Sequence, residues 1–511
     1  MTKKTSKWLL VSVLTALLMT LIAFGTGPTN VTAAAGRTLV YGSTADPKGL
    51  SPLSTADTVS SNVIQQVYET LFRQDAKTLK AKPWLAKSYE RKSATDWIIH
   101  LRTGIKFQDG TPFNAAAVKY TFDQMKDPKR AAPRASLLEP IASTTVVNDS
   151  TVEIKTKYPY GPFLAMLSHP NASIVSPTAD KKGKLNTHPV GTGPFKFKSW
   201  TTGDSVKLVR NTDYWGKKPK LAGVTFKTVP DYATAVSMLQ TGKIQLLDNV
   251  TSDYLSRIKS LTNVKLTNKA GTPMRYFGFN MQSNPGKNKK FRQAAAYAIN
   301  AKTYVAQLNG LGTYNPSLIG PELFGYNKND KKAATTYNLK KAKELVKANG
   351  FNKKTYTILV GNQPAYVQMA QVVQQQLAKA GIKVKIEKQE WATYLTTLAS
   401  GKFEMTFSGW ANSTGDASEL FYPNLDSKNI GSSNYMKYSN KQFDAEVEKS
   451  RETLNTSERK KALSAANKIA MKDIPWIVMD HNSVAVAQAK DLKGVTVLPT
   501  GLWYLGGAYF N

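Results

Sequence analysis

The residue types that most often carry catalysis or bind metals are scarce in this sequence. Its 511 residues include no Cys and four His, at His100, His169, His188 and His481. The missing Cys excludes disulfides, thiolate zinc sites, iron–sulfur clusters and cysteine nucleophiles. The His residues show none of the spacings of metal-binding motifs such as H-E-x-x-H. We therefore expect no bound metal and no cofactor, and structural roles for the His side chains.

Two short patterns resemble fragments of enzyme motifs. Ser256-Arg-Ile-Lys259 fits the S-x-x-K pattern of some acyl-transfer enzymes, but the accompanying K-T-G motif is absent. Gly191-Thr-Gly193 lacks the downstream G-K-[ST] of a phosphate-binding loop and is typical of a turn. No G-x-S-x-G nucleophile motif is present. The sequence therefore gives little support to a catalytic function.

The charge of the chain is strongly positive and comes mainly from lysine. The sequence contains 57 Lys and 12 Arg against 35 acidic residues, a formal net charge of +34. Proteins that read nucleic acids rely on Arg, whose planar guanidinium pairs bidentately with bases and phosphates. The Lys excess instead predicts a cationic, solvated surface and no nucleic-acid partner. Such a surface would attract anionic cell-wall polymers or lipid, and salt would weaken that attraction.

The N-terminus has the order of segments found in secretory signals. Lys3, Lys4 and Lys7 precede an apolar run over residues 8–24, and small residues follow at 33–35. We predict a signal peptide over residues 1–35; an uncleaved anchor is the alternative, because the apolar run is slightly long. No later run is long enough to span a bilayer. The mature chain is thus expected outside the cytoplasm, and without Cys it carries no thioether-linked lipid anchor.

The elements that position the remaining side chains follow from the spacing of apolar residues. Alternation predicts strands at 37–41, 97–101, 152–156, 355–360, 382–386 and 404–408. Helical spacing predicts helices at 60–72, 115–125, 337–348, 366–380 and 441–470, and the tail at 495–510 is typical of a loop. The succession of strand and helix from 355 to 408 predicts βαβ units on a mostly parallel sheet. Asp109-Gly110 predicts a tight turn, and Asn114 predicts a helix N-cap.

Six segments, in order along the chain, carry a resemblance to a known family. They are Gly104–Lys119, Pro189–Phe195, Arg292–Asn300, Tyr337–Gly350, Phe403–Trp410 and Ile474–Ile477. Together they resemble the signatures of the large, peptide-binding class of extracytoplasmic solute-binding proteins that serve ABC importers. The resemblance covers residues 37 to about 505, which is nearly the whole mature chain.

The resemblance implies a two-lobed, periplasmic-binding-protein-like α/β fold. Lobe I would comprise residues 36–272 and 483–511, with an extra subdomain at about 76–188, and lobe II residues 273–482. The chain would cross between the lobes near 271–274 and 479–482, which makes a hinge. A ligand enclosed by both lobes favours the closed state, because only that state lets both lobes contact it.

The same resemblance implies the partners. The protein would be a monomer that binds a short peptide and delivers it to the permease and ATPase subunits of an importer. Relatives in single-membrane bacteria are commonly held by a lipidated Cys. Since this chain has none, we expect a surface protein of such a bacterium that its charge retains. A cationic adhesion protein is one alternative, and a nickel or haem binder of the same fold is another; the few His and missing Cys oppose the metal site.

The identity of the peptide depends on the segment after Trp410. Dipeptide-binding members place an Asp three residues after this Trp, where the present sequence has Ser413. They also use an Arg on the helix that matches 366–380, where this sequence has Gln368. The segment 409–416, which ends in Asp416, instead resembles the glutathione-binding branch, as do residues 188–193 and 274–276. We therefore expect a short acidic or modified peptide such as glutathione.

Eight residues are the candidate ligand contacts that the resemblance implies. They are Arg275, Trp410, Ser413, Asp416, Thr55, Asp57, Trp391 and Trp503. Arg275 would pair with a ligand carboxylate and Asp416 with its ammonium group. The alternatives are a structural ion pair for Arg275, a loop cap for Asp416 and core packing for the three Trp residues.

Overall fold

The computed structural model describes residues 36–511, and residues 37–511 form one compact unit. The predicted signal peptide at 1–35 lies outside the described residues, so its cleavage stays a prediction. Within the described residues, no helix is long and apolar enough to cross a membrane.

One large sheet runs through the unit, in the order β15-β14-β16-β12-β17-β11-β1-β10-β9-β8, with β13 paired to β17. Its strands are β1 (Thr38–Ser43), β8 (Phe195–Thr201), β9 (Ser205–Arg210), β10 (Gly223–Thr228), β11 (Leu246–Leu247), β12 (Val264–Phe279), β13 (Gly312–Thr313), β14 (Thr355–Gly361), β15 (Lys383–Gln389), β16 (Met405–Trp410) and β17 (Trp476–Ala489). At one end β1 is parallel to β10 and β11, and at the other β14 is parallel to β15 and β16.

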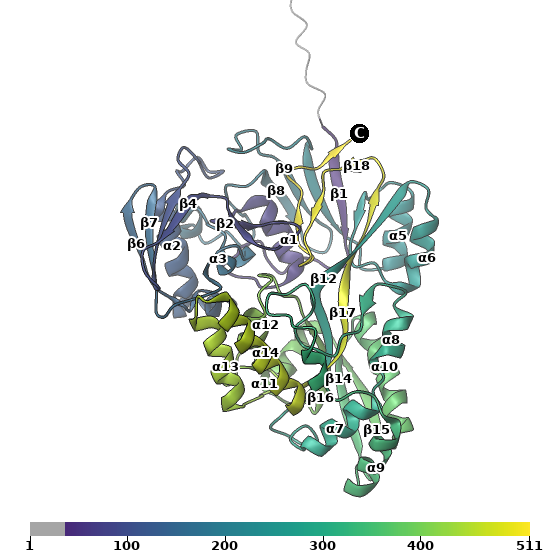
Figure 1. Cartoon of the computed structure of the whole chain (residues 1–511). Helices are drawn as coiled ribbons and strands as arrows, with labels where there is room; N and C mark the ends of the chain where they lie inside the picture. Colours follow the sequence, from purple (N-terminus) through teal and green to yellow (C-terminus); the bar gives the residue numbers. More distant parts are fainter. Residues whose placement is uncertain (1–35) are drawn as a thin grey trace, which may run out of the picture. The chain divides into compact units, whose positions relative to one another are not determined.

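The two predicted crossovers lie inside the long antiparallel pair β12 and β17 (Figure 1). Ala270 pairs with Ser483 and Met274 with His481, so β12 advances four residues where β17 advances two. Such a bulge bends a strand and accommodates Pro273, which has no N–H to donate to the ladder. The two segments that connect the lobes are therefore strands paired with each other. We use lobe I and lobe II below as names for the residue ranges defined above.

Lobe I surrounds β1, β8–β11 with helices and a second sheet. The helices are α1 (Thr58–Val67), α2 (Ala115–Lys126), α3 (Phe163–Met166), α4 (Pro177–Lys181), α5 (Tyr232–Gln240) and α6 (Ser252–Ser260). The second sheet, inside the range 76–188, has the order β4-β5-β7-β6, with β4 (Ala86–Arg91), β5 (Asp96–Leu101), β6 (Ile141–Asn148) and β7 (Thr151–Thr156). A small hairpin of β2 (Phe72–Gln74) and β3 (Ala81–Pro83) precedes it.

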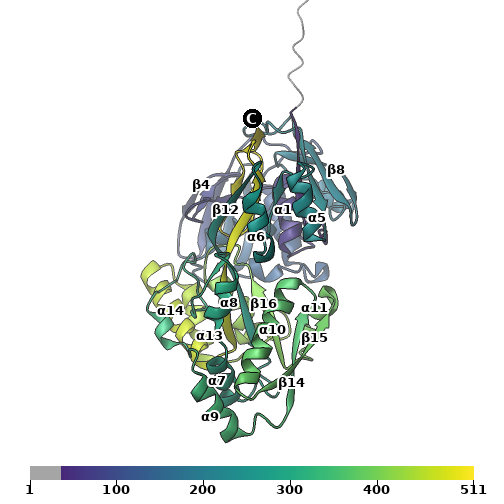
Figure 2. The same ribbon diagram turned by 90° about the vertical axis from the view of Figure 1, so that its right-hand side faces the viewer.

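Lobe II places helices on both faces of its strands. The helices are α7 (Lys289–Ala298), α8 (Ala301–Gln307), α9 (Leu339–Asn349), α10 (Pro364–Lys379), α11 (Trp391–Ser400), α12 (Ser418–Leu425), α13 (Lys441–Glu452) and α14 (Thr456–Asp473). Figures 1 and 2 show α7, α9 and α10 grouped away from α12, α13 and α14. Strand β12 explains the arrangement, because successive residues point to opposite faces. Tyr276 packs with the cluster under α12–α14, whereas Phe277 packs with the cluster under α7 and α10.

Most predicted elements are confirmed, with three corrections. The large sheet is mixed and not mostly parallel, because β12 pairs antiparallel with β16 and β17, and β9 pairs antiparallel with β8 and β10. The βαβ unit appears as β14, α10 and β15, Asn114 accepts a hydrogen bond from the N–H of Ala117, and Gly110 lies in a turn. The first helix ends at Val67 because Tyr68 is extended. The helical region predicted at 441–470 is confirmed and consists of two helices, since Asn455 caps a new one at Thr456. The tail predicted as a loop at 495–510 holds three short strands, β19 (Thr496–Val497), β20 (Trp503–Tyr504) and β21 (Tyr509–Phe510), and β21 pairs with β18 (Leu492–Lys493) just before the tail.

Candidate functional site

The loop after Trp410 is held by two side chains of lobe II. Asn412 Oδ1 accepts hydrogen bonds from the N–H groups of Thr414 (3.2 Å) and Gly415 (2.8 Å), and its Nδ2 donates to the Asp416 carbonyl (2.7 Å). Glu419 Oε2 accepts from the N–H of Ser413 (2.9 Å) and from both the N–H and Oγ1 of Thr414 (3.1 and 3.2 Å). The loop that follows Trp410 is thus held by a polar network in which Glu419 Oε1 takes no hydrogen bond.

An arginine from lobe I approaches this loop. The guanidinium carbon of Arg134 lies 5.0 Å from the centroid of the Trp410 ring, and its Nη1 lies 3.9 Å from Glu419 Oε1. Within the described residues, the Arg134 side chain donates no hydrogen bond that meets ordinary geometry, although only 18% of it is exposed. Glu419 Oε1 is buried and likewise has no hydrogen-bond partner there. Burial raises the pKa of Glu419 from about 4.5 to about 7.

Sequence reasoning missed both of these residues. Glu419 lies only three positions beyond the segment that carries the resemblance, but an acid at that offset looks like any helix N-terminal residue. Arg134 is one of 12 Arg in the chain, and its approach to Trp410 joins positions far apart in sequence. The one signal in the sequence is that Arg residues are few in this Lys-rich chain, which makes each of them a candidate.

Arg275 is occupied by a structural partner. On neighbouring strands β12 and β17, Arg275 Nε donates to Asp480 Oδ1 (2.9 Å) and Nη2 to Oδ2 (2.6 Å), and the Asp480 side chain is fully buried. Burial lowers the pKa of Arg275, but attraction to Asp480 outweighs this and raises it overall. The geometry matches the structural alternative, and a ligand role for Arg275 stays a prediction.

Asp416 is also engaged within the protein. Its Oδ2 accepts from Arg459 Nη2 (2.7 Å), and its Oδ1 accepts from the N–H (3.0 Å) and Oγ (2.8 Å) of Ser418 at the start of α12. Both carboxylate oxygens therefore have partners, as the loop-cap alternative requires. Ser413 belongs to the same loop, and its carbonyl accepts from Gln74 Nε2 of lobe I (2.7 Å).

The remaining candidates lie in three places. Thr55 is buried, with Oγ1 donating to the Ser51 carbonyl (3.1 Å), and Asp57 caps α1 through the Ser60 N–H (2.8 Å). Trp391 stacks with Tyr366, whose hydroxyl would lie 3.1 Å from a Cβ placed on Gly409. Trp503 is 2% exposed and packs in lobe I against Tyr41. The structure thus groups Trp410, Ser413 and Asp416 in one loop with Trp391 nearby, and places Trp503 in the lobe I core.

Comparisons with known proteins cover nearly the whole described chain. Residues 80–432 match the model of the bacterial extracellular solute-binding proteins, family 5 Middle. The glutathione-binding protein GsiB of Shigella flexneri is 33% identical over 465 residues, which cover 88% of this chain and 90% of that protein.

Two solved structures extend the likeness to the fold. DppA of Helicobacter pylori, a periplasmic binding protein in complex with the peptide STSA, is 28% identical with a TM-score of 0.85, over 93% of this chain and 98% of that one. The oligopeptide-binding protein AppA of Bacillus subtilis, in complex with a nonapeptide, is 26% identical with a TM-score of 0.83, over 93% and 100%. The predicted two-lobed α/β fold is thereby confirmed.

Proposed function

Because this chain belongs to the bacterial extracellular solute-binding proteins of family 5, the binding components of ABC importers, we propose that it captures short peptides and that its best ligand is glutathione-like. The two lobes close over the peptide, and a permease with its ATPase subunits takes it up. The likeness to GsiB supports the ligand class, as does the segment 409–416, which lacks the Asp of dipeptide-binding members.

The site assignment rests on Arg134 and Glu419, two charged side chains near Trp410 that have hydrogen-bonding atoms without a partner. A peptide carboxylate loses its hydration when lobes enclose it, so it needs charged donors in return. Arg134 offers them, because its N–H groups have no hydrogen-bond acceptor within the described residues. The Arg134 guanidinium lies beside Trp410, at 5.0 Å from the ring centroid, so the indole ring would cover the apolar part of the same ligand.

The ammonium group of the peptide has a matching acceptor. Glu419 Oε1 is buried without a hydrogen bond, at 3.9 Å from Arg134. An ammonium placed there gains a charge-assisted hydrogen bond and favours the ionised carboxylate. In this proposal Arg134 and Glu419 replace Arg275 and Asp416 as the charged anchors, while Arg275 and Asp416 hold the strands and loop that present Trp410.

A calorimetric titration tests the function. Residues 36–511 are titrated with di- to pentapeptides and with oxidised and reduced glutathione, and binding at micromolar or tighter affinity is expected for at least one acidic peptide. Absence of heat from every peptide and from glutathione would contradict the proposal. Tryptophan fluorescence recorded in the same samples reports whether Trp410 is covered, with Trp410→Phe as the variant that removes the signal.

Retention at the cell surface by charge is the finer part of the proposal. Removing residues 1–35 takes away three Lys and leaves a net charge of +31, which anionic envelope polymers attract. Washing intact cells with high salt should release the protein, since salt screens that attraction. A gene-deletion strain separates import from adhesion: loss of growth on the peptide supports import, and unchanged peptide uptake with reduced attachment would support the adhesion alternative.

A further inference from the structure

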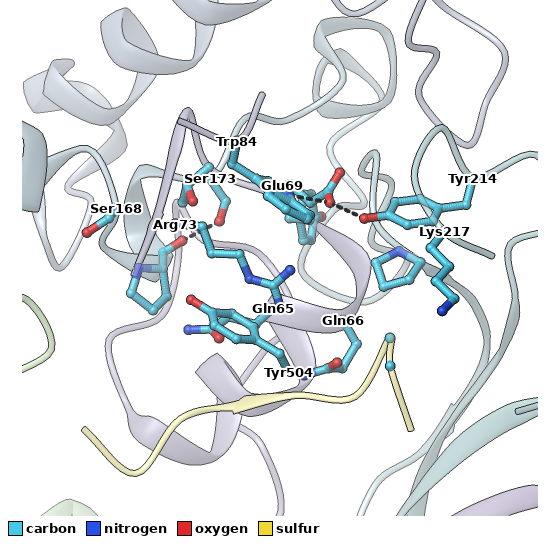
Figure 3. A pocket seen from close by; sticks show the side chains of 16 residues that line it. Gln65, Gln66, Glu69, Arg73, Trp84, Ser168, Ser173, Tyr214, Lys217 and Tyr504 are labelled. Carbon is cyan, nitrogen blue, oxygen red and sulfur yellow. Dashed lines mark hydrogen bonds between the residues drawn. The ribbon is translucent and has the colours of Figure 1, made fainter. Parts of the chain in front are cut away.

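Lobe I contains a cavity of about 170 Å³ that is separate from the Trp410 site. Figure 3 shows side chains from α1, from β2 and from the C-terminal tail converging on it. Its walls are Gln65, Gln66, Tyr68, Glu69, Thr70, Arg73, Trp84, Ser168, Pro170, Ser173, Pro194, Tyr214, Lys217, Tyr504, Gly506 and Gly507. A cavity of about 150 Å³ holds a molecule of the size of benzene, so this one holds about six non-hydrogen atoms and excludes a dipeptide.

Arg73 supplies an unpaired positive charge to this cavity. Its guanidinium carbon lies 3.3 Å from the centroid of the Tyr504 ring and 4.6 Å from that of Trp84 (Figure 3). Stacking on two rings fixes the plane of the guanidinium, and its interaction with the Tyr504 hydroxyl leaves further in-plane N–H donors for an anion. Within the described residues, Arg73 has no carboxylate within 4 Å, and neither does Lys217 on the other wall, whereas many other basic side chains of the chain have one.

The one carboxylate in the wall does not neutralise this charge. Glu69 accepts hydrogen bonds from four neutral donors: Trp84 Nε1 (2.7 Å), Tyr214 OH (2.7 Å), Trp215 Nε1 (2.8 Å) and Thr192 Oγ1 (2.8 Å). Burial raises the pKa of Glu69, and the four donors, which favour the ionised carboxylate, oppose that shift. The cavity therefore presents an excess of positive charge that an anion can match.

A buried acceptor stands on the same wall. Gln65 Oε1 is buried and has no hydrogen-bond partner within residues 36–511, although its neighbour Gln66 is fully used in contacts with Asn62, Trp503 and Leu505. A buried carbonyl without a hydrogen-bond donor is destabilising, because it loses its hydration and gains no hydrogen bond within the protein. An occupant that brings an N–H donor would satisfy it.

We propose that this cavity is a second binding site, for a single small α-amino acid of the size of glycine or alanine. The carboxylate pairs with the guanidinium of Arg73, and the amino group donates to Gln65 Oε1. The ligand is bound and released unchanged. This site does not depend on the peptide function proposed above, because its walls belong to lobe I alone.

Strand β2 connects the two sites. Successive residues of a strand point to opposite sides, so Arg73 faces the cavity while Gln74 donates to the Ser413 carbonyl in the Trp410 loop. Occupation of the cavity would hold β2 and with it the contact between Gln74 and Ser413.

Ligand-observed NMR and calorimetry on residues 36–511 test the proposal with four probes: glycine, alanine, acetate and glycinamide. We expect glycine and alanine to bind, acetate to bind more weakly because it lacks the amino group, and glycinamide not to bind because it lacks the carboxylate. Arg73→Gln should weaken glycine binding at least tenfold, and Arg73→Lys should restore part of it. Gln65→Ala should remove the preference for glycine over acetate.

The control is Arg257→Gln, which changes an exposed Arg on α6 and should leave glycine binding unchanged. Failure of glycine, alanine and acetate to bind at millimolar concentration would overturn the proposal and leave the cavity to water. Glycine binding that survives Arg73→Gln would contradict the proposal. If glutathione then displaces the glycine competitively, the amino acid binds at the Trp410 site instead.

Discussion

Two arginines reach from one lobe to the other, and they differ in how many of their donors the protein uses. Arg451 of α13 is 3% exposed and donates to Glu448 (2.7 Å), to the Tyr158 hydroxyl (2.8 Å) and to Glu139 (3.3 Å), with its guanidinium carbon 3.5 Å from the Tyr422 ring. Arg134 reaches in the opposite direction and donates no hydrogen bond within the described residues, although Glu419 lies 3.9 Å away.

The difference separates an arginine that has structural partners from the one that we propose binds the ligand. A guanidinium that already donates several hydrogen bonds within the protein has few donors left for a ligand, and removing it strands its acidic partners. A guanidinium with free donors beside an aromatic ring can still pair with a carboxylate that arrives from solution. Arg275 and Arg459 belong with Arg451, because Asp480 and Asp416 occupy them.

The largest expected effect is a loss of stability when Arg451, the arginine with partners inside the protein, is replaced. Arg451→Gln removes the charge that Glu139 and Glu448 share, so we expect the free energy of unfolding to fall by about 3 kcal/mol, the lower end for a broken buried pair, since Glu139 is one-third exposed. Urea unfolding of residues 36–511 measures it. The matched control is Arg257→Gln, expected within about 0.5 kcal/mol of wild type. A similarly small change for Arg451→Gln would show that the saturated contact does not stabilise the protein.

Arg134→Gln should give the opposite result. We expect peptide affinity to fall about tenfold to a hundredfold, the value of a hydrogen bond to a charged group, with little change in the free energy of unfolding. Calorimetric titration with glutathione, or with the best peptide of the screen, measures the affinity. A loss of stability equal to that of Arg451→Gln, with affinity unchanged, would remove the distinction between the two arginines.

Glu419, the acidic neighbour of Arg134, should make both stability and peptide affinity depend on pH. Its pKa in the folded chain, about 7, exceeds its ordinary value near 4.5, so the folded chain binds more protons and stability falls as pH rises between these values. Ligand ammonium pairs only with the ionised form, so peptide affinity should rise with pH up to about 7, by up to about tenfold per pH unit. Affinity measured across that range for wild type and Glu419→Gln tests this; the variant should bind more weakly and lose the slope. An unchanged slope in the variant would assign the pH dependence to another group.

The fold could be predicted from the sequence where the determining pattern is local. The β14–α10–β15 unit follows from apolar spacing within thirty-five residues, and Asn114 caps its helix through a bond to the third residue after it. The break between α13 and α14 was predictable too: Asn455 with Glu458 three residues later is an N-terminal capping signature, and Asn455 Oδ1 accepts from the N–H of Glu458. The helix-forming composition on both sides hid it.

The site could be predicted only in part, because its partners come from distant positions. The motif around Trp410 located the loop, but nothing local says that Asp480 occupies Arg275 from the neighbouring strand, 205 positions away. Arg451 and Glu139 are separated by 312 positions. Whether an arginine is free or occupied depends on those partners, so the sequence motif indicated the loop after Trp410 but not the charged residues that we propose there.

The smallest expected effect tests how much of the stability provided by the Arg451 contacts comes from Tyr158 alone. Tyr158→Phe removes one acceptor of Arg451 and the hydroxyl that donates to Glu139 (2.7 Å), and leaves the ion pairs and the aromatic ring in place. We expect the free energy of unfolding to fall by about 1–2 kcal/mol, the net value of the two hydrogen bonds lost, and peptide affinity to stay unchanged. In a double-mutant cycle with Arg451→Gln the two effects should not add, since both residues belong to one network. Simple additivity would mean that Tyr158 contributes through packing, and that Glu139 and Glu448 alone saturate Arg451.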